Sequence, residues 1–383
     1  MVSNVDGDLG QLSRLLRKNI LFSTVQGIRS VVRLYGEIGT DQLIDISEDD
    51  YVINSINTEI TKHDEQYALE DEDLMFGTQI QFCSLAPKPF LNICKSSGFS
   101  TDYLNEILQP SKFLQDALKN QKFSEGKSGS FFVFSPDKKL IIKTIPEHEF
   151  SSMKHLIKDY YEHLMKNPDS LLIRLLGAFS LTFVHTKVYI IFMANLFTMP
   201  VHEKYDLKGS WVARTASESS SVKKDNDFTS TILMDAEHAK FFVNQIRADT
   251  AVLCKHNIMD YSLLLGVIPR NKKDNNKKLK NSSAISLEDL STRDEENVDL
   301  ESEPERTSPL PRTTFTSPDG ELSYVISIID ILQTYNLDKR MERITKVYAL
   351  CKDKQGLSVQ EPEVYRSRFV EKMSQHIQIQ KYL

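Results

Sequence analysis

Residues 258–266 have the sequence IMDYSLLLG, in which a single carboxylate stands among apolar residues. The preceding residues 240–257, KFFVNQIRADTAVLCKHN, have the apolar periodicity of a long helix. We therefore expect Asp260 at the end of a helix, where its carboxylate could accept the proton of an attacking hydroxyl. By itself, Asp260 is also consistent with a structural aspartate at a helix end or turn.

A predicted β-hairpin lies upstream of this stretch. Residues 128–136 (SGSFFVFSP) and 139–145 (KLIIKTI) are rich in strand-forming residues, and Pro136, Asp137 and Lys138 favour a turn between them. Small residues before the first strand allow backbone N–H groups to approach a phosphate closely. These residues are Gly126, Ser128, Gly129 and Ser130. A plain hairpin entry is the alternative interpretation of this motif.

Lys143 is the one charged residue in the apolar strand LIIKTI and follows Gly126 by 17 residues. A lysine buried in a strand is costly unless it meets an anion. Protein kinases have a similar order, a glycine-rich loop followed by a strand lysine that contacts the nucleotide phosphates. The alternative is a lysine whose ammonium group extends to the rim of the sheet.

Asp330 directly follows the apolar run VISII and is expected at the end of a buried strand, a suitable place to hold Mg²⁺ on nucleotide phosphates. It follows Asp260 by 70 residues, and by 20 once the segment 269–318 is left out. That segment is rich in Lys, Asn, Ser, Glu and Pro, which predicts a disordered insertion. The corrected spacing agrees with kinases, whose metal-binding aspartate comes shortly after the catalytic loop.

A typical protein kinase is disfavoured by several departures from its pattern. The chain has no HRD or APE motif, and Leu265 stands where the asparagine of the catalytic loop would fall. Asp330 is followed by Ile331 and Leu332 instead of Phe and Gly.

Seven ordered motifs between about residue 75 and about residue 373 resemble those of the phosphatidylinositol phosphate kinases. They are GKSGSFFVF, IIKT, KYDLKGS, KDNDF, IMDYSLLLG, IIDILQTY and the closing SVxxPxxYxxRF. The resemblance implies an α+β, bilobal kinase-like fold with an antiparallel sheet in the N-terminal lobe and a mixed α/β C-terminal lobe. It assigns residues 75–383 to the catalytic domain and leaves residues 1–74 as a poorly matched N-terminal extension.

The resemblance also implies roles for individual residues. Gly126 and Gly129 would lie over the phosphates of ATP, and Lys143 would pair with those phosphates. Asp260 matches the catalytic aspartate of the family, and Asp330 matches its Mg²⁺-binding aspartate.

Two further residues match the family's substrate-binding side. Lys208 in YDLKGS would lie near the transferred or substrate phosphate, and Arg214 would contact the lipid head group. Without the resemblance, Lys208 would be an ordinary turn lysine beside Gly209 and Ser210.

Residues 331–361 resemble the activation segment that selects the lipid in this family. Within it, Met341, Ile344 and Tyr348 have helical spacing, which is typical of an interfacial amphipathic helix. The basic residues expected at the lipid surface are Lys339, Arg340, Arg343 and Lys346. An ordinary solvated surface helix is the alternative. Glu342 stands where phosphatidylinositol 4-phosphate 5-kinases carry glutamate and 5-phosphate 4-kinases carry alanine.

The resemblance thus predicts a lipid kinase that uses ATP and Mg²⁺ to convert phosphatidylinositol 4-phosphate to the 4,5-bisphosphate. The alternatives are a 5-phosphate 4-kinase, a 3-phosphate 5-kinase, a catalytically inactive membrane scaffold and a domain of a larger fusion. We expect a cytoplasmic protein, peripheral at the cytosolic face of membranes and above all the plasma membrane, acting in signalling on phosphoinositides in anionic bilayers. A homodimer is left open.

Composition agrees with these expectations. A formal net charge of −6 argues against general nucleic-acid binding. The four cysteines form no CxxC pair, so a zinc site is disfavoured. The start of the chain has no signal-peptide pattern, and no apolar stretch is long enough to span a membrane.

Periodicity predicts further elements on both sides of these motifs. Helices are expected near the N-terminus at 9–22, within 84–119 with Thr101 and Ser111 as N-caps, and at 153–167. Strands are expected at 170–183 and 187–197, the second of them central because it is almost wholly apolar. The N-terminal half is therefore expected to be mainly β.

Overall fold

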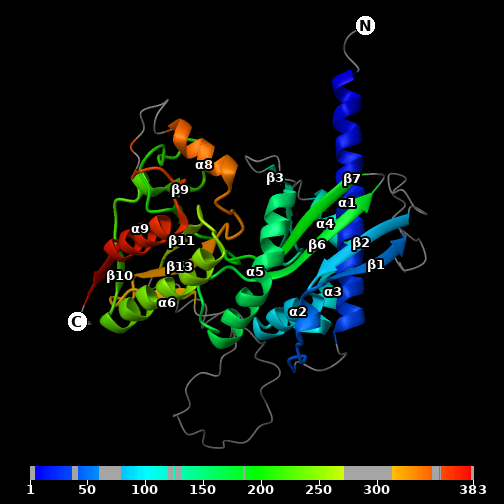
Figure 1. The fold of residues 1–383 in the computed structure, drawn as a ribbon, viewed down its shortest axis with the longest axis horizontal. Helices are drawn as coiled ribbons and strands as arrows, with labels where there is room; N and C mark the ends of the chain where they lie inside the picture. The colour runs from blue at the N-terminus through cyan, green and yellow to red at the C-terminus, as the bar shows by residue number, and fades with distance from the viewer. Residues whose placement is uncertain are drawn as a thin grey trace, which may run out of the picture.

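The computed structural model describes residues 5–36, 42–59, 79–119, 124–125, 131–183, 186–270, 313–346, 353 and 355–380. These residues form two lobes, one built on a seven-stranded sheet and the other on a five-stranded sheet (Figure 1). Helices pack on both sheets, and every paired strand of the larger sheet is antiparallel to its neighbour. The predicted α+β, bilobal fold is confirmed.

The sheet of the N-terminal lobe contains the predicted hairpin. In order across the sheet, its strands are β1 (Ile53–Glu59), β2 (Gln79–Leu85), β6 (Leu175–Phe183), β7 (Thr186–Ala194), β5 (Leu140–Ile145), β4 (Phe131–Phe134) and β3 (Ser124–Glu125). In the β4–β5 hairpin, Phe132 lies opposite Lys143. The apolar strand β7 is fourth of the seven, which confirms its predicted central place.

This lobe is richer in helix than expected. Its helices are α1 (Val5–Tyr35), α2 (Pro87–Ser96), α3 (Thr101–Ile107), α4 (Pro110–Lys119) and α5 (Glu147–Lys166). Helix α1 packs on α2, α3, α4 and strands β2 and β6, and its Phe22 and Val25 are fully buried. The predicted N-terminal helix therefore belongs to the core of this lobe. No helix of the described part of the chain is long and apolar enough to cross a bilayer.

The two predicted N-caps are wrong, the first by one residue and the second by two. The hydroxyl of Ser100 accepts the N–H of Tyr103, so Ser100 caps α3 and Thr101 is its first helical residue. Helix α4 begins at Pro110, which places Ser111 inside the helix. Proline suits this first position because its φ is already helical and its missing N–H would have no helical partner.

The C-terminal lobe is built on a smaller sheet flanked by three described helices. Its strands, in order, are β12 (Thr314–Thr316), β13 (Leu322–Ile329), β11 (Ser262–Pro269), β8 (Glu203–Leu207) and β9 (Lys223–Lys224). The helices are α6 (Ala236–Lys255), α8 (Leu337–Ile344) and α9 (Pro362–Gln375), and a separate pair of strands is β10 (Ile232–Met234) with β14 (Ile377–Ile379). The described residues also form two short 3-10 turns, η1 (Glu48–Tyr51) beside α2 of the N-terminal lobe and η2 (Asp225–Asp227) beside β8.

The predicted insertion 269–318 is too long at both ends. Pro269 closes strand β11, and residues 314–316 form β12, which pairs with β13. Residues 314–316 are ordered because the buried ring of Phe315 packs against the rings of Phe241 and Phe242 on α6. Residues 271–312 lie outside the described residues.

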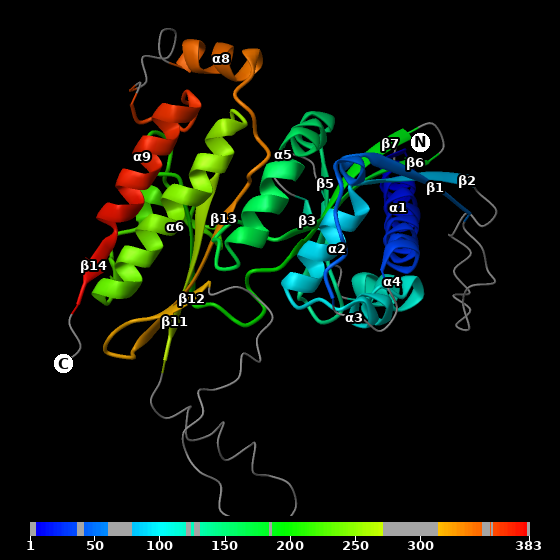
Figure 2. The ribbon, with the colours of Figure 1, turned by 60° about the horizontal axis from the view of Figure 1, so that its bottom comes forward.

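Helix α5 lies between the two lobes (Figure 2) and is tied to α6 by two histidine–aspartate contacts. His163 Nε2 on α5 lies 2.6 Å from Asp249 Oδ1, and His256 Nε2, just after α6, lies 2.6 Å from Asp159 Oδ2 on α5. Asp249 is fully buried and accepts further hydrogen bonds from the Ser170 hydroxyl, the Leu171 N–H and the Gln245 amide. A buried carboxylate is tolerated because these donors replace water.

We expect Phe22→Ala to lower the free energy of unfolding by about 3–5 kcal/mol, because it leaves a cavity under α1. Urea denaturation measures the change. The matched control on the same helix is Leu34→Ala, since Leu34 is 65% exposed and its loss should shift stability by no more than about 0.5 kcal/mol. Equal effects of the two substitutions would show that α1 is not part of the core.

Candidate active site

Strand pairing brings three of the predicted site residues to one edge of the smaller sheet. In the antiparallel register of β11 with β13, Ser262 lies opposite Ile329, so Asp260 and Asp330 leave the two strands at the same end. In the register of β11 with β8, Leu263 lies opposite Leu207, which places Lys208 at this end too. Lys208 and Asp330, which are 52 and 70 positions from Asp260 in the sequence, therefore lie near it in the fold.

Asp260 and Asp330 both have left-handed backbones, with φ of 64° and 58°. This conformation is uncommon for residues other than glycine, and aspartate is among those that tolerate it best. Asp260 is not at a helix end as predicted, because α6 ends at Lys255 and a loop follows. The loop is held instead by the segment after Asp330, since the Met259 N–H donates to the Gln333 carbonyl.

Lys208 and Asp260 form an ion pair at the sheet edge. Lys208 Nζ lies 2.8 Å from Asp260 Oδ1, and the two side chains are only 12% and 23% exposed. Low exposure limits the competition of water for this contact. Behind it, the buried Tyr365 hydroxyl on α9 donates to the Tyr261 carbonyl and holds the residue after Asp260.

Lys143 reaches this edge from the other lobe. Its Nζ lies 3.7 Å from Asp330 Oδ1, with the side chains 32% and 51% exposed. Along β5 the neighbouring Leu140 and Ile142 are buried, so the alternation of the strand turns Lys143 away from the core. The pair joins the two lobes and leaves both groups accessible to a ligand.

Glu149 is a neighbour of this pair that the sequence reasoning did not single out. It lies in the first turn of α5, six residues after Lys143. Burial raises the pKa of its carboxyl; the charge of Lys143 opposes the rise and that of Asp330 adds to it. In protein kinases a helix glutamate pairs with the strand lysine. A glutamate in the helix after LIIKTI was the available sequence signal.

Asp225 shapes the loop that carries Lys208. Its Oδ1 accepts the N–H groups of Lys208 and Gly209 at 2.8 and 2.7 Å, and its Oδ2 accepts Arg214 Nε at 2.6 Å. Asp225 belongs to the quoted motif KDNDF, but nothing in that motif shows which backbone it binds. Only the folded loop brings these partners together.

Arg214, predicted to contact a lipid head group, is only 7% exposed. Its guanidinium contacts Asp225 and also donates to the carbonyl and carboxylate of Asp206. The geometry gives it a part in holding the 208–214 loop, and a head-group contact stays a prediction. The phosphate-loop residues Gly126, Ser128, Gly129 and Ser130 lie outside the described residues.

Helix α8 carries the predicted lipid-facing residues Lys339, Arg340 and Arg343, and Lys346 follows two residues after its end. Asn336 caps it by accepting the Lys339 N–H. Glu342 bridges Lys339 and Lys346 at 2.9 and 2.5 Å. Burial would raise the pKa of Glu342, but the hydrogen bonds from Lys346 and Lys339 outweigh it and hold the pKa below its usual value.

Of the other described side chains on α8, some contact the rest of the lobe and others are exposed to solvent. Arg343 pairs with Glu361 at 3.3 Å and so fastens the helix to the start of α9. Arg340 is exposed and Met341 is 60% exposed. The apolar stripe is only partly described, because the side chain of Ile344 and all of Tyr348 lie outside the described residues.

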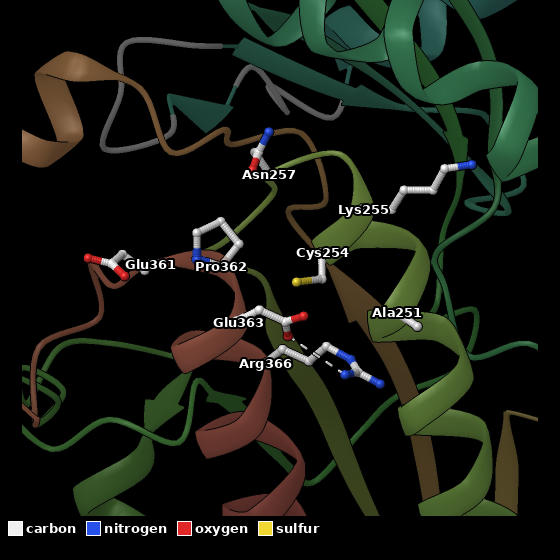
Figure 3. A pocket seen from close by; sticks show the side chains of 8 residues that line it. All are labelled: Ala251, Cys254, Lys255, Asn257, Glu361, Pro362, Glu363 and Arg366. Carbon is white, nitrogen blue, oxygen red and sulfur yellow. Dashed lines mark ion pairs between the residues drawn. The ribbon is translucent and has the colours of Figure 1, made fainter.

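An open depression of about 480 Å³ lies between the end of α6 and the start of α9 (Figure 3). It is lined by Ala251, Cys254, Lys255, Asn257, Glu361, Pro362, Glu363 and Arg366. Burial, together with Glu363, raises the pKa of the Cys254 thiol to about 11, so this thiol stays protonated at neutral pH. The depression contains none of the residues described above at the sheet edge.

Known proteins resemble this chain over most of its length. A family model described as phosphatidylinositol-4-phosphate 5-kinase matches residues 113–376. A probable phosphatidylinositol phosphate kinase from Dictyostelium discoideum is 31% identical over 343 residues, covering 77% of this chain and 47% of its own length.

Two further relatives carry different specificities in their names. A phosphatidylinositol 4-phosphate 5-kinase from Plasmodium falciparum is 29% identical over 325 residues, which is 78% of this chain and 18% of the relative. A phosphatidylinositol 5-phosphate 4-kinase type-2 beta from Rattus norvegicus is 31% identical over 202 residues, which is 50% of this chain and 47% of the relative. The chain thus spans less than half the length of each of these three relatives.

We expect Glu149→Gln to change how stability depends on pH. Because the folded state raises the pKa of Glu149, its stabilising contribution is fully present below the ordinary value of 4.5 and is lost as pH rises through the raised value. Urea denaturation from about pH 4 to about pH 7 should show the wild type losing stability relative to the variant as pH rises. Glu237→Gln, at an exposed glutamate of α6, is the control. Parallel curves for wild type and Glu149→Gln would contradict the expectation.

Proposed function

This chain belongs to the phosphatidylinositol phosphate kinase family, and on that basis we propose that it transfers the γ-phosphate of ATP to the 5-hydroxyl of phosphatidylinositol 4-phosphate. One observation carries the proposal: two ion pairs, Lys143 with Asp330 and Lys208 with Asp260, meet where the lobes face each other. Phosphoryl transfer depends mainly on positioning and on positive charge around the phosphates, and this arrangement supplies both.

We assign a different role in phosphoryl transfer to each charged residue at this edge of the sheet. Asp260 orients the inositol hydroxyl and accepts its proton. Lys208, 2.8 Å away, holds that carboxylate in place and brings positive charge to the side where the phosphate arrives. Lys143 binds the nucleotide phosphates from the other lobe, since its ammonium group already lies 3.7 Å from Asp330 Oδ1.

Asp330 has the properties of a Mg²⁺ ligand. Its carboxylate is about half exposed, and Mg²⁺ is usually bound through one or two carboxylates together with substrate phosphates and water. When bound there, the ion would neutralise charge on the phosphates. The left-handed backbone of Asp330 and its contact with Lys143 fix where the carboxylate points.

The choice of the 5-hydroxyl rests on Glu342. The relatives include both a 5-kinase and 4-kinases at similar identity, so overall likeness does not separate the two reactions. Glu342 lies between Lys339 and Lys346 and sets the spacing of their ammonium groups. We assign the specificity to this arrangement of charges on and just after α8, which the alanine typical of 4-kinases would not produce.

The same helix supports peripheral binding at the cytosolic face of an anionic membrane. Lys339 and Arg340 on α8 and Lys346 just after it provide positive charge, and Met341 on the same helix is 60% exposed. Each basic residue near an anionic surface contributes about 1 kcal/mol to binding.

Radiolabelled ATP offered with each monophosphoinositide in anionic vesicles tests the proposal. Label should enter phosphatidylinositol 4-phosphate and give the 4,5-bisphosphate, identified by head-group analysis. A 3,5-bisphosphate or a product from the 5-phosphate would identify one of the other kinases. ATP turnover without any lipid product, or no turnover at all, would refute the lipid kinase.

We expect Asp260→Asn to lower kcat by about 10²–10⁴-fold, because the amide cannot accept the hydroxyl proton. The side chain keeps its shape, so the folded structure and the KM for ATP should change little. Steady-state kinetics with phosphatidylinositol 4-phosphate vesicles measures both constants. Glu237→Gln removes a carboxylate from the same lobe without touching the site and should behave as wild type. An Asp260→Asn variant with full activity would show that Asp260 does not accept the hydroxyl proton.

We expect Glu342→Ala to shift the product toward that of a 4-kinase, because it releases Lys339 and Lys346 from their shared partner. Rates with the 4-phosphate and the 5-phosphate lipids are compared, and their ratio should change by about tenfold or more. Glu342→Gln is the companion variant, since it keeps the length of the side chain but weakens both pairs. An unchanged ratio in both variants would exclude Glu342 as the specificity residue.

A further inference from the structure

The short loop after Lys208 contacts the far end of the segment that follows Asp330. The backbone N–H groups of Trp211 and Val212 both donate to the Gly356 carbonyl, at 3.2 and 3.1 Å. The hydroxyls of Ser210 and Ser358 lie 3.0 Å apart. Two stretches separated by about 145 residues are thus joined by backbone and side-chain hydrogen bonds.

The side chain of Trp211 completes this contact. Its Nε1 donates to Asp353 Oδ2 at 2.8 Å. The ring lies so close to Gly356 that an added Cβ there would sit 2.4 Å from Nε1. On the α9 side, Lys372 Nζ lies 5.8 Å from the ring centroid, within reach of a cation–π attraction.

The other end of the loop carries Lys208. Only Gly209 and Ser210 separate Lys208 from Trp211, and the N–H groups of Lys208 and Gly209 are fixed on Asp225. Gly209 has φ of 64° and approaches the side chain of Lys372, so this loop has little freedom to adjust. The Trp211 contact and the Lys208–Asp260 ion pair therefore lie at the two ends of one short, constrained loop.

Trp211 is 39% exposed, more than a side chain that serves only the core. We propose that Trp211 is a positioning residue, which couples the end of the segment after Asp330 to the Lys208–Asp260 ion pair. This inference rests on the proposed function, since it assigns Trp211 to the same phosphoryl transfer. Within that segment, the residues that contact the Trp211 loop are Asp353, Gly356 and Ser358.

Steady-state kinetics with phosphatidylinositol 4-phosphate vesicles tests this coupling. We expect Trp211→Ala to lower kcat by about tenfold to a hundredfold while the KM for ATP stays within about twofold, because the nucleotide side of the site is untouched. Trp211→Phe keeps a ring against Gly356 and loses only the bond to Asp353, so it should recover most of the rate. The control Val364→Ala removes an exposed apolar side chain from the same lobe and should behave as wild type.

Hydrogen exchange gives a readout that does not need lipid turnover. Amides of residues 355–361 and of residues 207–212 should exchange faster together in Trp211→Ala, while those of β11 and β13 stay protected. Unchanged exchange, or a kcat equal to wild type, would overturn the coupling. If Trp211→Ala raises the KM for ATP and lowers the melting temperature, and Trp211→Phe restores neither, then Trp211 serves only packing. A wild type that phosphorylates no lipid would refute the proposed function, while exchange would still show whether Trp211 joins the two segments.

Discussion

Antiparallel pairing of β11 with β13 on one side and with β8 on the other is the constraint on which the candidate site depends. The register places Asp260, Asp330 and Lys208 at one sheet edge, because each follows or precedes a paired strand by one or two residues. A slip by one residue would turn these side chains to the opposite face. The left-handed backbones at both aspartates then set where the carboxylates point.

The second constraint is the position of α5 between the lobes. Contacts of Asp159 and His163 with partners on and just after α6 tie this helix to the loop that leads to Asp260. The same helix begins at Glu147, directly after β5, and places Glu149 beside Lys143. The ion pair between Lys143 and Asp330 is therefore held from both lobes, which is how two residues on different sheets come to lie together.

Much of the fold could be predicted where the cause is local. The β4–β5 hairpin, the long helix α6 and the strand that ends at Asp330 follow from apolar periodicity and turn chemistry. Predictions failed where distant contacts decide. The predicted insertion wrongly included strand β12, which is ordered because Phe315 packs on α6. Asp225 and Glu149 were not singled out, since their partners are set by loop shape and by burial.

The sequence by itself determined the order of the chemistry-bearing residues and, through ordered motifs, the family and the bilobal α+β fold. The tertiary structure alone decided which of these residues meet. Lys208 pairs with Asp260 and Lys143 with Asp330 because strand register and lobe packing act between segments far apart in the chain. It also decided that Arg214 is buried on Asp206 and Asp225. Spacing along a chain carries no information on such contacts, since each depends on how separate elements pack.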